Sequence, residues 1–206
     1  MMDREKIAGI SVSRETVQRL EIYQNLIRKW TAHINLVSRK SLDELETRHI
    51  ADSAQIFQIA RPQSGKWVDL GSGGGLPGIV IAILSAEHAR DLQVTLVEAD
   101  QRKAEFLRTV SRETSVAFTV IAERIETVPA MKADYLSARA LAGLPDLLTH
   151  ADRHLSRFGK AYFPKGAQHR TERTLAEQQW AFTCKAHKSL TDPQAVIYEI
   201  DEVRRV

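Results

Sequence analysis

Four of the five residues 71–75 are glycine, and this cluster directly follows an apolar run that ends at Leu70. Glycine adopts positive φ angles without strain and lets the backbone approach a ligand closely, because it has no Cβ. Pro77 and Gly78 come next, and proline suits the first turn of a helix, where its missing N–H is not needed. Residues 67–78 therefore predict a strand, a tight turn built for ligand contact, and the start of a helix.

From Lys66 onward, short apolar runs alternate with helical stretches. Strands are expected over 66–70, 93–98, 118–121, 134–137 and 160–163, and helices over 79–86, 100–114 and 146–155. This order predicts a doubly wound α/β fold, in which right-handed crossovers cover both faces of a mostly parallel, twisted sheet. After a polar helix over 168–180, two runs over 182–190 and 195–203 are joined by only four residues. That link is too short for a crossover helix, so we expect an antiparallel C-terminal edge.

The first 64 residues predict a helical extension in front of this domain. Ser13 is a candidate N-cap, and apolar residues recur at spacings of three and four from Val17 to Ile34. Residues 41–44 have the pattern of a capping box, which is followed by a second apolar stripe from Leu45 to Phe57. We therefore expect an extension over 1–64 and an α/β domain over 65–206, which together form one compact unit.

Composition narrows the class of protein. The chain has 206 residues, of which 43% are hydrophobic and 27% charged, as in an ordinary globular domain. The longest apolar run, 79–84, is too short to span a membrane, and no signal-peptide core follows Met1, so a soluble cytoplasmic protein is expected. The one cysteine, Cys184, has no partner for a disulfide or a zinc site, and no metal is expected. The net charge of +3 permits an anionic partner without requiring one.

The glycine cluster matches two ligand-binding patterns. Gly73-x-Gly75-x-x-Gly78 fits a dinucleotide fingerprint, whereas Asp69-x-Gly71-x-Gly73-x-Gly75 fits the first motif of class I S-adenosylmethionine (SAM) methyltransferases. A carboxylate at position 69 would repel a pyrophosphate but suits SAM, which is cationic at its sulfonium and ammonium groups and carries no phosphate. Gly71 also begins the turn directly after the strand. These points favour SAM on a Rossmann-like methyltransferase fold, although a glycine turn that merely connects strand to helix stays possible.

Further candidates lie at the carboxyl ends of the following strands. Glu98 can accept hydrogen bonds from the hydroxyls of an adenosine ribose, while Asp100 is better placed to cap the next helix. Ile125 can offer apolar contact and a backbone amide to adenine. Glu126 can orient a neighbouring group there, or can simply form a solvated pair with Arg124.

Arg139 follows the fourth strand, at the same edge of the sheet, where it can hold a carboxylate or phosphate with two parallel hydrogen bonds. Many class I methyltransferases carry an acidic-proline-proline-tyrosine motif here to hold an exocyclic amine. This chain lacks that motif, which argues against methylation of an amino nitrogen of adenine or cytosine.

Several motifs in this order resemble those of the 16S rRNA guanine-N7 methyltransferases, also called the glucose-inhibited division protein B family. The resemblance covers nearly the whole chain from Trp30 onward. It rests on Ile34-Asn35-Leu36, Arg48-His49-Ile50-x-Asp52-Ser53, residues 69–78, Arg124-x-Glu126, Ser137-x-Arg139-Ala140 and Lys165-Gly166. The sequence departs from the family pattern at Glu98, where aspartate is common, and at Val37, where threonine is common.

The resemblance implies an enzyme that methylates N7 of a guanine in 16S ribosomal RNA or the small ribosomal subunit. It implies SAM contacts at Gly71, Leu76, Ile125, Glu126 and Arg139, to which the residue chemistry adds Gly73 and Glu98. For RNA, the matching motifs favour Arg48, His49 and Lys165. An alternative for Arg48 is a helix-surface pair with Asp52.

N7 of guanine carries a lone pair and no proton, so an in-line displacement requires positioning and no general base. No catalytic acid or base is therefore expected. Two rival functions remain open on the sequence, a small-molecule methyltransferase on the same fold and a non-catalytic regulator that binds SAM or a nucleotide. A monomer is expected.

Overall fold

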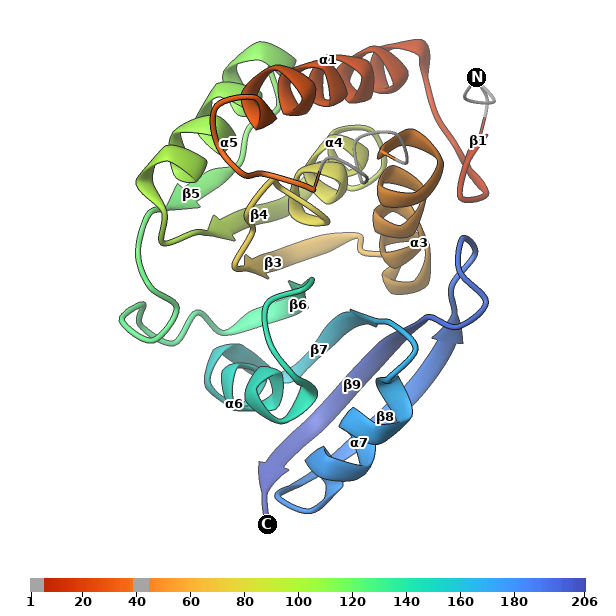
Figure 1. The fold of residues 1–206 in the computed structure, drawn as a ribbon, viewed down its shortest axis with the longest axis vertical. Helices are drawn as coiled ribbons and strands as arrows, with labels where there is room; N and C mark the ends of the chain where they lie inside the picture. Colours follow the sequence, from red (N-terminus) through yellow and green to blue (C-terminus); the bar gives the residue numbers. More distant parts are fainter. Residues whose placement is uncertain (1–5, 39–44) are drawn as a thin grey trace.

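The computed structural model describes residues 6–38 and 45–206, so the predicted capping box at 41–44 lies outside the described residues. Its centre is a seven-stranded sheet in the order β5-β4-β3-β6-β7-β9-β8 (Figure 1). The strands are β3 (Ser64–Leu70), β4 (Asp91–Val97), β5 (Thr119–Ile121), β6 (Ala133–Ala138), β7 (Leu155–Lys165), β8 (Trp180–Lys188) and β9 (Val196–Arg205).

The first five of these strands run parallel, and β9 is antiparallel to both of its neighbours. The predicted antiparallel ending is thus confirmed, with one detail that the sequence did not reveal. β9 inserts between β7 and β8, so β8 forms the edge of the sheet.

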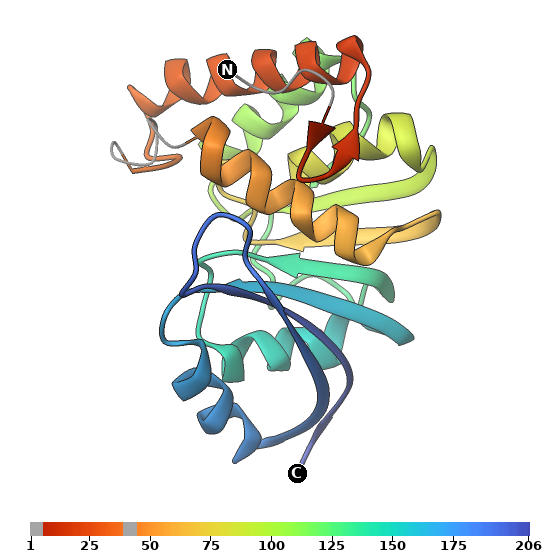
Figure 2. The same ribbon diagram turned by 90° about the vertical axis from the view of Figure 1, so that its right-hand side faces the viewer.

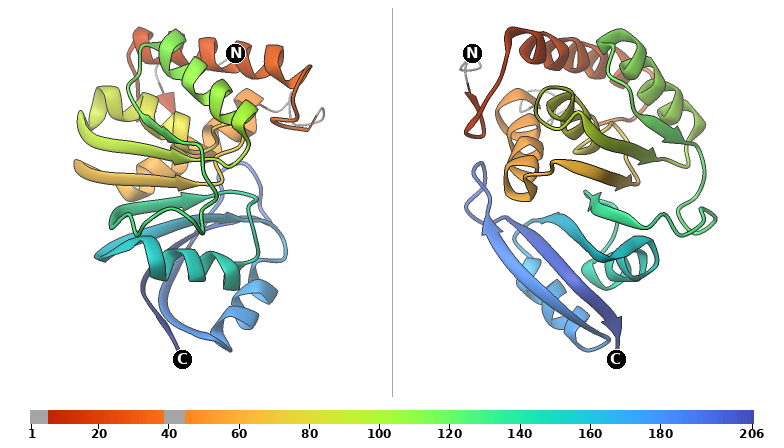
Figure 3. Two further views of the ribbon diagram at one scale, coloured as in Figure 1. Left: turned by 90° about the vertical axis from the view of Figure 1, so that its left-hand side faces the viewer. Right: turned by 180° about the vertical axis from the view of Figure 1, so that it is seen from behind.

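Helices cover both faces of the sheet (Figures 2 and 3). They are α1 (Arg14–Thr31), the π-helix η1 (Leu45–Ile50), α3 (Ala51–Ala60), α4 (Gly78–His88), α5 (Gln101–Thr114), α6 (Leu144–His154) and α7 (His169–Glu177). Side chains of β3 alternate between two cores, since Trp67 packs with α3, α4 and α5 whereas Val68 packs with α6. This two-sided burial confirms the predicted doubly wound α/β fold.

The N-terminal extension packs onto the α/β part. A short hairpin of β1 (Lys6–Ile7) and β2 (Ile10–Ser11), which the sequence analysis did not predict, precedes α1. Ser13 is the N-cap of α1, as predicted, and its side chain accepts a hydrogen bond from the backbone N–H of Thr16. Glu87 of α4 accepts hydrogen bonds from the backbone and side chain of Ser13, which ties the start of α1 to α4. The buried face of α1 shares one core with α4 and α5.

The glycine turn has the predicted backbone geometry. Gly71, Gly73 and Gly75 have φ angles of 62°, 53° and 90°, which only glycine adopts without strain. α4 then begins at Gly78, so Pro77 occupies the N-cap position, one residue before the helical turn expected for it. A Cβ on Gly78 would lie 2.1 Å from a methyl group of Leu96, so glycine there permits α4 to pack closely on the sheet.

Candidate active site

A pocket of about 570 Å³ lies at the carboxyl ends of β3, β4 and β6, the edge at which open α/β sheets bind ligands. All seven residues that the sequence analysis assigned to the cofactor line this pocket: Gly71, Gly73, Leu76, Glu98, Ile125, Glu126 and Arg139. Residues up to 68 positions apart in the chain are therefore brought together around one space.

Glu98 follows β4 and links the glycine turn to the segment that precedes α5. Its carboxylate accepts a hydrogen bond from the backbone N–H of Gly73 at 2.7 Å and another from that of Asp100 at 2.8 Å. The side chain of Asp100 caps α5 by accepting from Arg102 and Lys103, which confirms the role predicted for it. Glu98 thus fixes the glycine turn, a function that the sequence analysis did not predict, while it also faces the pocket.

Asp69 lies beneath the glycine turn, and it is not among the described residues that line the pocket. Its Oδ1 accepts a hydrogen bond from Ser137 at 2.6 Å, and the Ser137 hydroxyl accepts one from the Trp67 indole at 2.9 Å. Burial raises the pKa of the Asp69 carboxyl to about 6, against the lowering effect of the hydrogen bonds from Ser137 and Ser72. Asp69 is therefore separated from the pocket by the turn, and a ligand in the pocket would not contact it directly.

The N-terminal extension also contributes to the pocket. The hydroxyl of Tyr23 on α1 donates a hydrogen bond to the carbonyl of Gly74 at 2.7 Å, and Leu36 and Val37 line the pocket. The sequence analysis placed Tyr23 only in a buried apolar stripe. A tyrosine in a buried stripe could have indicated this contact, because a buried tyrosine hydroxyl requires a hydrogen-bond partner.

Ile125 and Glu126 line the pocket from the segment after β5. Ile125 is nearly buried, with 8% of its surface exposed. Arg124 and Glu126 form the solvated pair that was considered as an alternative, with 3.8 Å between Nε and Oε2. Both side chains also line the pocket, so the pair and a role in ligand binding are compatible.

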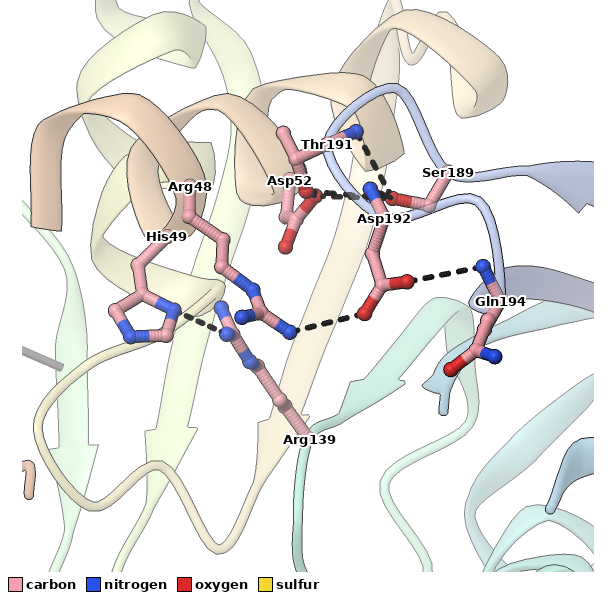
Figure 4. Close-up of polar contacts among 8 residues, drawn as sticks. All are labelled: Arg48, His49, Asp52, Arg139, Ser189, Thr191, Asp192 and Gln194. Atoms are coloured by element: carbon pink, nitrogen blue, oxygen red, sulfur yellow. Dashed lines mark hydrogen bonds and ion pairs between the residues drawn. The ribbon is translucent and has the colours of Figure 1, made fainter. Parts of the chain in front are cut away.

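Arg139, just after β6, contacts His49 of η1 through Nη2 and the ring nitrogen Nδ1 (Figure 4). A guanidinium group can only donate, so Nδ1 of His49 is the acceptor and the ring proton lies on Nε2. Burial lowers the pKa of Arg139, and the nearby Asp52 carboxylate opposes this effect. Arg139 Nη1 is buried and has no hydrogen-bond partner among the residues the structure describes.

A second pocket, of about 490 Å³, shares Arg139, Ala140 and Leu141 with the first. Arg48 and Lys165 line it, whereas His49 lines the first pocket. The three residues predicted to contact RNA are thus distributed around two adjoining pockets.

The turn between β8 and β9 closes one side of the second pocket. Arg48 of η1 forms an ion pair with Asp192 of this turn at 3.0 Å (Figure 4). Asp52 of α3 accepts hydrogen bonds from the hydroxyls of Ser189 and Thr191. A helix-surface pair of Arg48 with Asp52 was considered from their spacing, but the ion pair of Arg48 with Asp192 joins residues 144 positions apart.

Lys165 ends β7 and has only 8% of its side chain exposed. Its ammonium forms an ion pair with Glu172 of α7 at 2.6 Å and donates to the carbonyl of Ala142 at 2.8 Å. Lys165 therefore holds α7 to the loop after β6, in addition to lining the second pocket.

Comparisons with known proteins decide the family. The family model described as GidB, rRNA small subunit methyltransferase G, matches residues 16–198. The chain belongs to the GidB family. A relative named ribosomal RNA small subunit methyltransferase G, from Ruegeria sp. (strain TM1040), is 52% identical over the full length of both chains. One of the same name from Cereibacter sphaeroides is 45% identical, also over the full length of both.

Solved structures show that this GidB-family chain has the class I methyltransferase fold. A variant of MtNAS in complex with SAM superimposes with a TM-score of 0.61 and 16% identity, over 90% of this chain and 72% of that one. A TehB-like SAM-dependent methyltransferase from Corynebacterium glutamicum gives a TM-score of 0.56 at 16% identity, over 89% and 98% of the two chains. SAM is the cofactor of the chain.

The first pocket of this GidB-family chain fits SAM in its chemistry. A Cβ built on Gly73 would have the Gly71 carbonyl oxygen, 3.8 Å away, as its nearest described neighbour, so the turn forms an open cradle. Two carboxylates, Glu98 and Glu126, suit hydroxyl and ammonium groups, and apolar side chains such as Ile125 suit an adenine ring. Within residues 6–38 and 45–206, no cluster of His, Cys, Asp and Glu side chains is arranged to hold a metal ion.

Proposed function

We propose that this chain transfers a methyl group from SAM to N7 of a guanine in 16S ribosomal RNA by in-line displacement. The observation that supports this most strongly is the junction at Arg139, where the pocket lined by the glycine turn adjoins a second pocket whose lining includes Arg48 and Lys165. A methyl donor and a large methyl acceptor require two adjoining pockets that share a boundary. Membership of a family named for small-subunit rRNA methylation supports the choice of RNA as the acceptor.

In this proposal the seven predicted residues hold the cofactor in the first pocket. Gly71 and Gly73 provide the backbone cradle, and Leu76 and Ile125 provide apolar walls. Glu98 accepts from the ribose hydroxyls while it keeps the turn in place through Gly73. The remaining two, Glu126 and Arg139, lie at the rim, where Glu126 orients neighbouring groups and Arg139 holds the carboxylate end.

Catalysis in this proposal consists of positioning. SAM supplies an electrophilic methyl group when it is bound. The lone pair of guanine N7 needs no deprotonation, so the chain has to orient the base and exclude water, which in ideal intramolecular models lowers a barrier by about 7 to 11 kcal/mol. His49 contributes by accepting from Arg139, which restricts the guanidinium at the junction of the two pockets.

Arg48, His49 and Lys165 are proposed to contact the RNA. Arg48 is 42% exposed in its side chain and lies on the rim of the second pocket, where it can reach a phosphate while it pairs with Asp192. The ammonium of Lys165 has three donors, of which Glu172 and Ala142 take two. As far as the described residues show, one N–H of Lys165 is then left for a phosphate oxygen.

We also propose that the extension over 1–64 and the domain over 65–206 act as one monomeric unit in the cytoplasm. The core shared by α1, α4 and α5 supports a single unit. Among the described helices, none combines the length and the apolar character that crossing a bilayer requires.

The deciding experiment incubates the purified chain with radiolabelled SAM and small ribosomal subunits that lack the modification, followed by nucleoside analysis. The expected product is 7-methylguanosine in 16S rRNA, with a rate that falls steeply as salt rises because phosphates are bound. Label in a small metabolite, with little salt dependence, would support a small-molecule methyltransferase. Binding of SAM without turnover on any RNA would support a regulator.

A further inference from the structure

The second pocket contains charges of both signs. Its lining includes three cations and three carboxylates: Arg48, Arg139, Lys165, Asp52, Glu172 and Asp192. Glu172 and Asp192 form ion pairs with Lys165 and Arg48, whereas Asp52 accepts only from hydroxyls within the described residues, and a carboxylate without a cation repels a phosphate. A guanine base presents both kinds of group, with donors at N1 and N2 and acceptors at O6 and N7. The mixed lining therefore favours a base over a phosphate inside the pocket.

Asp52 has an acceptor oxygen that the protein does not use. Its Oδ1 accepts from Ser189 and Thr191, whereas Oδ2 makes no hydrogen bond within the described part of the chain. In Figure 4 this second oxygen points away from the β8–β9 turn. Asp52 lines the second pocket, and a carboxylate oxygen there can accept from a donor on a bound base.

Arg139 has an unused donor at the boundary of the two pockets. Its Nη1 is buried without a partner among the described residues, which is unfavourable for a charged donor. Nη1 carries two N–H groups, so one can donate to the SAM carboxylate in the first pocket and the other to an acceptor that enters the second pocket beside it. Around the edge of guanine, N7 is followed by O6 and then by N1–H and the N2 amine, so the atom next to N7 is an acceptor.

We propose that the second pocket holds the target guanine base, with Arg139 donating to O6 and Asp52 accepting from the N1–H and N2 edge. This inference rests on the proposed function and deepens it, since it identifies the residues that select guanine. N7 then faces the first pocket. Adenine is rejected because it presents an amino donor to Arg139 and an acceptor at N1 to Asp52, which leaves buried polar groups without partners.

The test uses small subunits reconstituted with guanosine or inosine at the position that the unaltered chain methylates. Inosine keeps N7, O6 and N1–H but lacks the N2 amine. The unaltered chain should favour guanosine by about tenfold in kcat/KM, because one hydrogen bond to a charged group is lost. Asp52→Ala should bring the guanosine-to-inosine ratio close to one. Asp52→Asn is a second variant that keeps the shape of the side chain, in case the alanine variant fails to fold. It should also lower the guanosine-to-inosine ratio.

Thr191→Val is the matched control. It removes a hydroxyl that holds Asp52 but leaves the carboxylate, and Gln55 still fixes the turn through the backbone of Lys188 and Leu190. Its ratio should equal that of the unaltered chain. If Thr191→Val lost discrimination as fully as the Asp52 variants, or if the Asp52 variants kept it, Asp52 would act only through the turn and the inference would be overturned.

A binding measurement separates this inference from the proposed function. Guanosine monophosphate should bind the chain more tightly than inosine or adenosine monophosphate in an NMR titration, and Asp52→Asn should reduce the preference for guanosine over inosine monophosphate. Equal binding of the three nucleotides would overturn the inference even where 7-methylguanosine is formed. Preferential binding of guanosine monophosphate without any 7-methylguanosine in 16S rRNA would instead overturn the proposed function and leave the base pocket standing.

Discussion

The hydroxyl of Tyr23 donates a hydrogen bond to the carbonyl of Gly74 at 2.7 Å, across 51 positions of the chain. Tyr23 is fully buried on α1, and Gly74 is the residue of the glycine turn that packs against Leu36. The N-terminal extension therefore supports the first pocket directly. Its contribution to the site can be measured through this one contact.

Tyr23→Phe should weaken both the fold and cofactor binding. The buried carbonyl of Gly74 would lose its partner, which costs about 1–3 kcal/mol, and the turn would be less firmly placed. Thermal unfolding should show a lower Tm, and calorimetry should show several-fold weaker binding of S-adenosylhomocysteine. Tyr198→Phe is the control, since that hydroxyl contacts His169 away from the first pocket. It should lower Tm without a change in affinity.

Glu98→Gln should reduce affinity for S-adenosylhomocysteine by about tenfold or more, because a hydrogen bond to a charged group contributes about 1.5–3 kcal/mol. The carboxylate accepts from both Gly73 and Asp100, and an amide can accept through only one of its two end atoms. Asp100→Asn keeps an N-cap side chain and should leave the affinity nearly unchanged. Equal affinity of Glu98→Gln and the unaltered chain would contradict this role of Glu98.

The free energy of unfolding should decrease as the pH rises from about 4 to about 6, because of Asp69. Its pKa is raised from 3.8 to about 6 in the folded state, so the folded chain keeps a proton that the unfolded chain releases. The difference between the two pKa values corresponds to about 3 kcal/mol of stability, which is fully lost once the pH exceeds the folded-state pKa. Urea unfolding of Asp69→Asn should lack this part of the decline. A variant with the same pH profile as the unaltered chain would place the titration elsewhere.

Arg48→Ala should weaken binding to small subunits and reduce the slope of log affinity against log salt by about one, since one phosphate contact is removed. Binding of S-adenosylhomocysteine should stay the same, because Arg48 lines only the second of the two pockets. Arg108→Ala removes an exposed arginine of α5 that pairs with Glu105, and serves as the control. An unchanged salt slope for Arg48→Ala would show that Arg48 does not bind a phosphate.

Features that depend on nearby residues were predictable. The period of the apolar pattern indicated the alternation of strands and helices, and the positive φ angles followed from the glycines at 71, 73 and 75. The cap at Asp100 was predicted because its partners, Arg102 and Lys103, lie within one helical turn. The seven pocket residues were predicted because the carboxyl ends of parallel strands meet at one edge.

Features that depend on packing between distant segments were not predictable. The π-helical form of η1 and the insertion of β9 between β7 and β8 have no local signal in the residues concerned. Sequence spacing suggested that Arg48 pairs with Asp52, but in the folded chain Asp192 comes within 3.0 Å of it. Likewise, the place of Asp69 beneath the turn depends on how Ser137 of β6 is aligned with β3.

The sequence by itself determined the order of strands and helices from β3 onward, the shape of the glycine turn and the edge of the sheet at which the first pocket lies. Those follow from backbone preferences and from the burial of apolar side chains at regular spacings. Only the tertiary structure decided which partner each buried polar group takes, as for Tyr23 with Gly74 and Asp52 with the β8–β9 turn. One order of strands and helices is compatible with many hydrogen-bond pairings between distant side chains. Packing decides among them, because the donors and acceptors that it buries away from water must find partners in the protein.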